Sequence, residues 1–271
     1  MKPNYQLVIG SSIGALIALM SVVSLFWVPH DYNMIDHSVR LSPPSSSYIF
    51  GTDNFGRDVL SRVMAGGRNS LLLAVCTVAG AAATGCALGL LAGFRGGLTG
   101  EIIMRIIDTL SSFPGIVLAL LLVAVMGNSQ FSLFIALLIL FIPGYTRVMR
   151  TGAMQHRNSI FVQAEKILGA GFFRITFIHI LPNLAPSLLS ASVLGLSNAI
   201  LAESAMSYLG MGIQPPEPSW GRMLFESQGW FFNAPWYALT PGIFIMLTVI
   251  AFHLLGEGIK KSFGGQHGSF D

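Results

Sequence analysis

The chain has 271 residues, of which 53% are hydrophobic and only 10% are charged, with a formal net charge of +3 at pH 7. A soluble domain has about 25% charged residues, so this chain is predicted to cross a membrane several times. Its basic residues are scattered singly or in pairs, which excludes a nucleic-acid-binding patch.

Uncharged runs predict six transmembrane helices, each needing about 20 residues. The first run is longer than the apolar part of a cleavable signal peptide, so we expect it to be retained. The charge-free stretch from Thr109 to Thr146 would be about 57 Å long as one helix, so it is expected to turn at residues 127–130. The expected spans, in one transmembrane domain covering residues 1–271, are 7–28, 70–94, 102–126, 131–149, 184–206 and 237–256.

The distribution of Lys and Arg predicts the orientation of this domain. With the N-terminus in the cytoplasm, most basic residues fall on the cytoplasmic side, and acids offset those in the long first loop. We therefore expect both termini and a loop at 150–182 to be cytoplasmic.

The first long loop has closely spaced charges. Asp53 and Arg57 stand at i,i+4 spacing, as do Asp58 and Arg62, which favours a short structural helix capped by Asp53. Contact with another protein outside the membrane is a second interpretation. Trp220, in the later Pro- and Trp-rich loop, suits either the membrane interface or such a contact.

Two acids lie within expected spans, where charge is costly and usually functional. Asp108 follows Arg105 by one turn, so local pairing is one interpretation. Glu203 lies near the outer end of the fifth span with no base close in sequence, which suits a polar contact between helices. A gate or a place along a transport path is the second interpretation of both acids.

The segment FVQAEKILGAGFFRITFIHILPN, residues 161–183, interrupts the apolar pattern. Residues 160–168 are expected to form two helical turns, and Gly169 to end them with a positive φ angle. Pro182 suits the first turn of the next span, where its missing N–H costs little. A basic loop that only fixes topology is the alternative.

In its spacing this segment resembles the cytoplasmic EAA loop of ABC-importer permeases: Glu-Ala-Ala, three residues, Gly, nine residues and Ile-x-Leu-Pro. Gln163 and Glu165 depart from the first and third positions of that motif, and His179 stands where many permeases have Ile. Further stretches are similar to the second permease of dipeptide, oligopeptide and nickel importers, among them GTDNFGRDVLSRV, SYLGMGIQPPEPSWGRML and LTVIAFHLLGEGI.

This resemblance implies a type I ABC-importer permease fold and a chain that forms half of the pore of an ATP-driven importer. Short peptides are the first expected solute, and nickel or another metal chelate is the alternative. The loop would couple to an ATPase. The implied coupling residues are Gln163, Ala164, Glu165, Lys166, Gly169, His179, Leu181 and Pro182.

The resemblance also implies the partners of the chain. These are a second homologous permease, two cytoplasmic ATPases that hold ATP and Mg, and an extracytoplasmic solute-binding protein, assembled in a bacterial inner membrane. In this setting, the outer contact considered for Asp53, Arg57, Asp58 and Trp220 would be with the binding protein.

The sequence predicts no catalytic or cofactor site in this chain. Its six histidines are dispersed without metal-ligand spacing, and no P-loop motif is present, so ATP is expected on other subunits. A membrane-embedded enzyme is therefore disfavoured. A proton-coupled secondary transporter that uses Asp108 or Glu203 is the more remote alternative.

Overall fold

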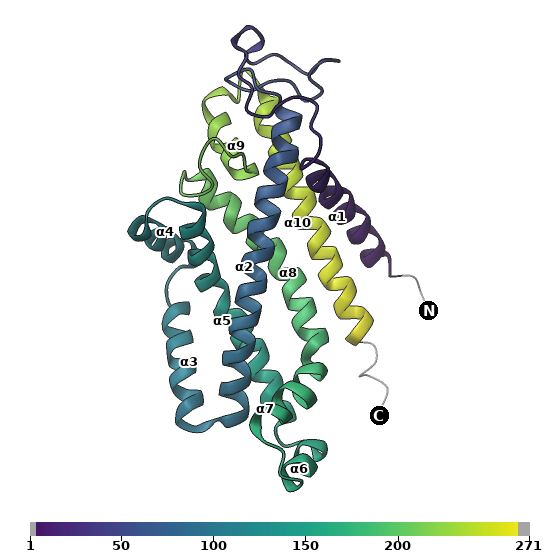
Figure 1. Cartoon of the computed structure of the whole chain (residues 1–271), viewed down its shortest axis with the longest axis vertical. Helices are drawn as coiled ribbons and strands as arrows, with labels where there is room; N and C mark the ends of the chain where they lie inside the picture. Colours follow the sequence, from purple (N-terminus) through teal and green to yellow (C-terminus); the bar gives the residue numbers. More distant parts are fainter. Residues whose placement is uncertain (1–3, 265–271) are drawn as a thin grey trace.

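The structure is a computed structural model that describes residues 4–264, and it is built from helices (Figure 1). The expected all-α class is confirmed. Lys2, which contributed to the expected orientation, lies outside the described residues. The α-helices are α1 (Tyr5–Val23), α2 (Val59–Arg95), α3 (Gly97–Ser111), α4 (Gly115–Met126), α5 (Gln130–His156), α6 (Ile160–Ile167), α7 (Phe172–Arg174), α8 (Leu181–Tyr208), α9 (Trp220–Ser227) and α10 (Pro235–Gly264).

Three shorter elements complete the chain: the 3-10 helices η1 (His37–Val39) and η3 (Gln228–Trp230), and the π-helical turn η2 (Ile175–Ile180). Five helical segments of the described chain are long and apolar enough to cross a membrane. They are α1, α2, α5, the α7–η2–α8 run and α10. The pair α3–α4 makes a sixth if it counts as one span.

The α3–α4 pair differs from the single third helix expected at 102–126. α3 begins at Gly97 and ends at Ser111, and α4 starts after Pro114 at an angle of 89° to α3. Proline lacks a backbone N–H and disfavours helical geometry in the preceding residue, here Phe113. The helix therefore breaks at this point and does not merely bend.

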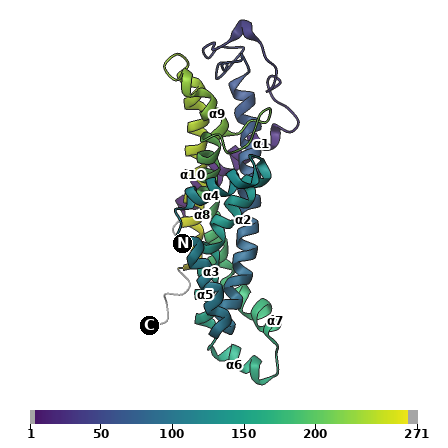
Figure 2. The same cartoon turned by 90° about the vertical axis from the view of Figure 1, so that its left-hand side faces the viewer.

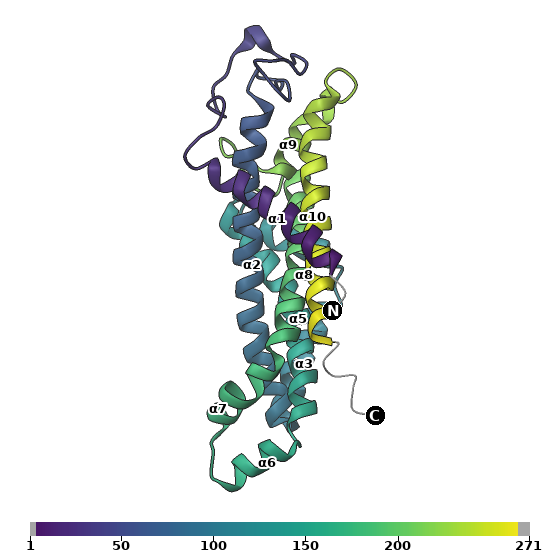
Figure 3. The ribbon, with the colours of Figure 1, turned by 90° about the vertical axis from the view of Figure 1, so that its right-hand side faces the viewer.

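The long helices run side by side and leave two distinct ends (Figures 1 and 2). One end, which we call the cap end, carries the loop 24–58 and the segment 209–234 that contains α9. The opposite end, which we call the α6 end, carries α6 and α7. α1 crosses obliquely over α10 on the outside of the bundle (Figure 3).

α2 and α5 pack more closely than any side chain would allow, because three glycines of α2 face α5. Gly85, Gly89 and Gly93 recur at every fourth residue and so lie on one face. A Cβ atom added to Gly89 would lie 2.5 Å from the carbonyl oxygen of Thr146, and one on Gly93 would lie 2.6 Å from that of Arg150. Small residues at this spacing let membrane helices approach backbone to backbone.

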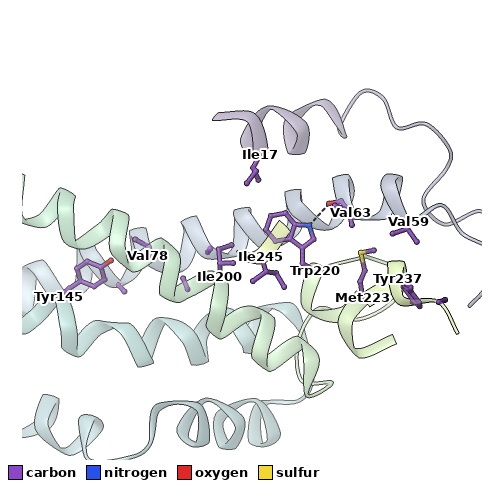
Figure 4. Packing of buried hydrophobic residues seen from close by; sticks show 14 residues of the cluster. Ile17, Val59, Val63, Val78, Tyr145, Ile200, Trp220, Met223, Tyr237 and Ile245 are labelled. Carbon is purple, nitrogen blue, oxygen red and sulfur yellow. Dashed lines mark hydrogen bonds between the residues drawn. The ribbon is translucent and has the colours of Figure 1, made fainter. Parts of the chain in front are cut away.

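The main core lies towards the cap end and joins α1, α2, α5, α8, α9 and α10 (Figure 4). Trp220 is completely buried at its centre and donates a hydrogen bond from Nε1 to the carbonyl oxygen of Val63 at 3.0 Å. The prediction of Trp220 at the membrane interface or against a binding protein is therefore wrong. An indole ring buries a large apolar area once its N–H finds an internal acceptor.

The α2–α5 contact generates a stability prediction. Gly89→Ala should lower the free energy of unfolding by about 1–3 kcal/mol, because its Cβ meets backbone atoms that can only move with the whole helix. Gly242→Ala is the matched control, since a Cβ there has no neighbour within 4 Å. Thermal unfolding in detergent measures both variants. Equal stability of the two would contradict the close backbone contact.

Candidate functional site

The loop between α5 and α8 projects from the α6 end and contains the helix α6 (Figure 1). At the end of α6, the Gly169 N–H donates to the carbonyl oxygen of Lys166 at 3.1 Å, and the Ala170 N–H to that of Glu165 at 2.9 Å. This pair of bonds is a Schellman motif, which requires a left-handed residue. Gly169 has φ +82°, so the predicted helical turns and positive φ are confirmed.

α6 is fixed to the bundle on one side and exposed on the other. Val162 is its only buried residue and packs into a cluster with Met149 of α5 and Leu184 of α8. On the outer side, Ile160 and Ile167 are 88% and 86% exposed. A short helix with one anchored face and large exposed apolar side chains is typical of a surface that another protein covers.

The polar residues of the loop mostly hold the loop together. The Glu165 carboxylate lies 3.4 Å from His179 Nε2, without hydrogen-bond geometry, and 3.9 Å from Arg174 Nε. Gln163 donates from Nε2 to the carbonyl oxygen of Asn158 at 2.9 Å. Glu165 therefore joins the two arms of the loop instead of offering its charge outward.

Ala164 and Lys166 both lie on the exposed part of α6. The Lys166 ammonium group sits 5.1 Å above the ring of Phe94, at the end of α2. This cation–π contact adds a second link between α6 and the bundle. Because the side chain of Ala164 is small, another chain could approach the backbone of α6 closely at this position.

Leu181 and Pro182 open α8, and Leu181 packs against the same cluster as Val162. Pro182 lies in the first turn of α8, as predicted. However, α8 does not start from a loop, because η2 leads into it directly within the helical segment Phe172–Tyr208. A π-helical turn is wider than an α-helical turn and interrupts its regular hydrogen bonding. A proline such as Pro182, which has no N–H to donate, therefore fits directly after it.

The cap end contains a buried network of charges. Arg57 donates to Asp53 at 2.6 Å and to Glu226 of α9 at 3.0 Å. Arg62 donates to the same Glu226 oxygen at 3.0 Å, and Arg222 donates to the other at 3.1 Å. Three guanidinium groups, two from around the start of α2 and one from α9, therefore converge on one carboxylate.

This network corrects two sequence-based expectations. Asp53 does not cap a helix but accepts bonds from the Phe55 and Arg57 N–H groups in a turn, while Asp58 is the N-cap of α2. Asp53, Arg57 and Asp58 are all buried within the chain, so the interpretation of these side chains as binding-protein contacts is wrong. Buried ions need partners nearby, and each has one here.

Glu226 was not predicted from the sequence, although Arg222 and Glu226 stand at the i,i+4 spacing that favours an ion pair. Burial alone would raise the pKa of the Glu226 carboxyl. The positive charges of Arg62 and Arg57, with the hydrogen bond from Arg222, outweigh this effect and lower the pKa from its ordinary value. Glu226 is therefore ionised in the folded protein.

The two acids in the spans have different surroundings. Glu203 of α8 is completely buried and accepts a hydrogen bond from Ser207 at 2.7 Å, beside the hydroxyls of Ser70 and Ser219. This arrangement favours a polar contact between helices. Asp108 of α3 is exposed and pairs with Arg147 of α5 at 3.0 Å, so the expected local pairing with Arg105 is wrong.

Residues 4–264 contain no group of three or more His, Cys, Asp or Glu side chains arranged to hold a metal ion. The fold and the loop thus define an all-helical protein of a membrane, with a short exposed helix held at one end of the bundle. Residues 85–263 match the family described as "Binding-protein-dependent transport system inner membrane component". The chain belongs to this family of ABC-importer permeases.

Several curated proteins are similar over nearly the whole chain. The probable D,D-dipeptide transport system permease protein DdpC of Escherichia coli (strain K12) is 39% identical over 260 residues, covering 96% of this chain and 87% of the relative. The dipeptide transport system permease protein DppC of Haemophilus influenzae is 35% identical, with coverage of 96% and 90%. The glutathione transport system permease protein GsiD of Pectobacterium atrosepticum is 36% identical, with coverage of 91% and 84%.

This protein is therefore a multi-pass membrane permease subunit of a bacterial ABC importer and not its ATPase. By family, such a permease works with a partner permease, ATPases and a binding protein, and ATP binds to the ATPase subunits. The proton-coupled secondary transporter considered from the sequence does not agree with this membership.

The charge network at the cap end generates a pH prediction. Because the folded pKa of Glu226 is lowered, its stabilising contribution is present above the ordinary Glu pKa of 4.5 and is lost as pH falls below it. Glu226→Gln should lower the free energy of unfolding at pH 7 by about 3–5 kcal/mol, since it leaves buried guanidinium groups unpaired. The variant should also lose less stability on acidification than the wild type.

Melting temperatures at pH 7 and pH 4 measure both effects. Glu217→Gln is the control, because the Glu217 side chain is 45% exposed and its pair with Arg68 spans 3.5 Å. An exposed pair of this kind contributes about 0–1 kcal/mol. If Glu226→Gln were as stable as Glu217→Gln at pH 7, the network would not hold the cap end together.

Proposed function

We propose that this chain forms half of the translocation pore of an ATP-driven importer of short peptides, and that α6 is its coupling helix. The observation that carries the proposal is the geometry of α6, which is closed by Gly169, anchored through Val162 and exposed through Ile160 and Ile167. The outer surface would lie in a groove of an ATPase subunit, where its apolar side chains are removed from water.

Val162 gives this coupling a physical route. It contacts the cluster formed by α5 and α8, so a displacement of α6 by the closing ATPases would move both long helices. Packed interiors are stiff and transmit such shifts instead of absorbing them. In this mechanism the pore alternates between outward and inward access as the two ATPases close and open.

Peptides are favoured over nickel by the names of the relatives. Those compared above are described as permeases for dipeptides, D,D-dipeptides and glutathione, which is itself a tripeptide. Nickel or a metal chelate imported by the same mechanism is the other outcome of the uptake experiment below.

The proposed orientation places the α6 end in the cytoplasm and the cap end outside, facing a solute-binding protein. The excess of basic residues around the loop 150–182 supports it. Both chain termini would then be cytoplasmic, and α6 would meet the ATPases on the side where ATP is available.

Gly169 provides the test of coupling. Gly169→Val should strain the loop by about 1–3 kcal/mol, because a β-branched residue does not tolerate φ +82°. In proteoliposomes with its partner subunits, the wild type should take up a labelled dipeptide, and not nickel, only when ATP is supplied. The variant should be inserted at normal abundance but lose most uptake and retain less ATPase on purification.

Gly171→Val is the matched control for Gly169→Val. Both positions lie in the same loop with no atom within 4 Å of an added Cβ, but Gly171 has φ −74° and ψ 167°, which suit valine. Gly152, which lies just before the loop, would not serve as a control, because a Cβ added there would lie 2.5 Å from the Leu184 side chain. Normal uptake by Gly169→Val would mean that the loop only fixes topology.

Thiol labelling tests the orientation. In a background with Cys76→Ala and Cys86→Ala, Phe232→Cys at the cap end should react with an impermeant thiol reagent added to intact cells, since Phe232 is 96% exposed. Asn158→Cys, in the exposed loop before α6, should react only after the membrane is opened. Labelling of Asn158→Cys in intact cells would reverse the proposed orientation.

A further inference from the structure

One face of α5 is polar and exposed, although α5 is long and apolar enough to cross a membrane. Arg147, Thr151 and Gln155 follow each other at every fourth residue and therefore share this face. Together with Ser187 of α8 they line a recess of 410 Å³ between the two helices. Most other residues of this recess are apolar.

The charged side chains on this face form an ion pair but keep unused hydrogen-bond donors and acceptors. Arg147 donates from one terminal nitrogen to Oδ1 of Asp108 at 3.0 Å, and the two side chains are 48% and 62% exposed. A guanidinium group has five N–H donors, and a carboxylate has two accepting oxygens. Both groups can therefore take a further ligand without leaving each other.

This face is poorly suited to lipid. Arg147 lies near the inner end of the expected span 131–149, and Thr151 and Gln155 lie beyond it, in the part of α5 that is expected in the cytoplasm. Polar side chains at this end of a span face water or another protein chain and not the hydrocarbon core. Four polar side chains around a recess, with an exposed ion pair at its edge, fit a watery path.

Another exposed face of the bundle has the opposite character. The recess between α2 and the start of α5 is lined almost entirely by apolar side chains, among them Leu72, Cys76 and Phe134. The exposed residues of α1 are likewise large and apolar, such as Leu16 and Leu19. The polar face of α5 is thus a local feature of the bundle and not a general property of its surface.

We propose that this face lines the solute path and that Arg147 and Asp108 bind the two charged ends of a short peptide. A free peptide carries a carboxylate at one end and an ammonium group at the other. Arg147 would bind the carboxylate through its unused N–H donors, and Asp108 would accept bonds from the ammonium group. This assignment rests on the proposed function, because it takes the solute to be a peptide.

Thr151, Gln155 and Ser187 complete the site with neutral polar groups. Their side chains suit the peptide amide, while their lack of charge keeps binding weak enough for release. The Thr151 hydroxyl already donates to the carbonyl oxygen of Arg147 at 2.9 Å, so its oxygen remains free to accept. The site therefore recognises the peptide backbone and leaves its side chains unspecified.

Charge variants of the complex in proteoliposomes test this site. Arg147→Gln should reduce dipeptide uptake by about tenfold or more, the loss expected for a charge-assisted hydrogen bond, while assembly with the partner subunits is kept. The double variant Arg147→Asp with Asp108→Arg restores the ion pair with reversed positions. It should stay defective, whereas rescue would mean that the two residues only hold α3 against α5.

Arg105→Gln is the control, since Arg105 is also exposed on α3 but forms no ion pair within residues 4–264. It should transport as the wild type does. Loss of co-purification of the second permease in Arg147→Gln would assign the face to the interface between the permeases and overturn the proposal. Normal uptake by Arg147→Gln would overturn it as well.

Thiol chemistry tests the watery path independently of these charges. Thr151→Cys, in the background Cys76→Ala and Cys86→Ala, should react with a hydrophilic thiol reagent, and dipeptide-loaded binding protein with ATP should slow the reaction. In a separate variant that keeps Cys76 and carries only Cys86→Ala, Cys76 on the apolar face should remain unreactive. An unreactive Thr151→Cys would mean that another protein chain covers this face, and it would reject the site. If wild-type protein imported no peptide at all, the proposed function would fail instead.

Discussion

The contact between α2 and α5 determines where both ends of the molecule lie. Three glycines remove the side chains that would otherwise hold the two helices apart, so the backbones themselves are in contact. At the cap end, α2 carries Arg62 into the charge network. At the other end, α5 leads directly into the loop with α6. A change in the spacing of these two helices would therefore reach both the cap end and the α6 end.

The chain has few charges and uses them in two contrasting ways. At the cap end, the guanidinium groups of Arg57 and Arg62 are buried and neutralised by Glu226 and Asp53, so the network works as internal structure. Arg147 of α5 and its partner Asp108 of α3 remain exposed, and each can form further hydrogen bonds. A buried charged side chain whose hydrogen bonds are all made within the protein holds the fold together. An exposed one with unused donors or acceptors is available for a ligand.

The sequence predicted the features that depend on local pattern. Runs of apolar residues gave the all-α class, and a glycine after two helical turns gave the positive φ of Gly169, because both follow from interactions within a few residues. The span expected at 102–126 was placed correctly as an apolar run, but its break at Pro114 and the angle of 89° depend on how α4 packs against α5.

Features that depend on distant residues could not be predicted in this way. Asp108 pairs with Arg147, which is far along the chain, instead of with the neighbouring Arg105. Arg62 likewise reaches Glu226 across most of the sequence. Spacing along one helix says nothing about which of two available partners a folded chain brings closer.

The π-helical turn η2 has a consequence for the direction in which α6 faces. The Leu181 N–H donates to the carbonyl oxygen of Thr176, five residues back, so this turn holds one residue more than an α-helical turn. One residue corresponds to about 100° of rotation about the helix axis. The loop before η2 is thus out of phase with α8 by more than a quarter of a turn. The length of this single turn therefore sets the direction in which the exposed Ile167 and Leu168 point. A one-residue deletion within Ile175–Ile180 would rotate the loop about the axis of α8 without altering any residue of α6.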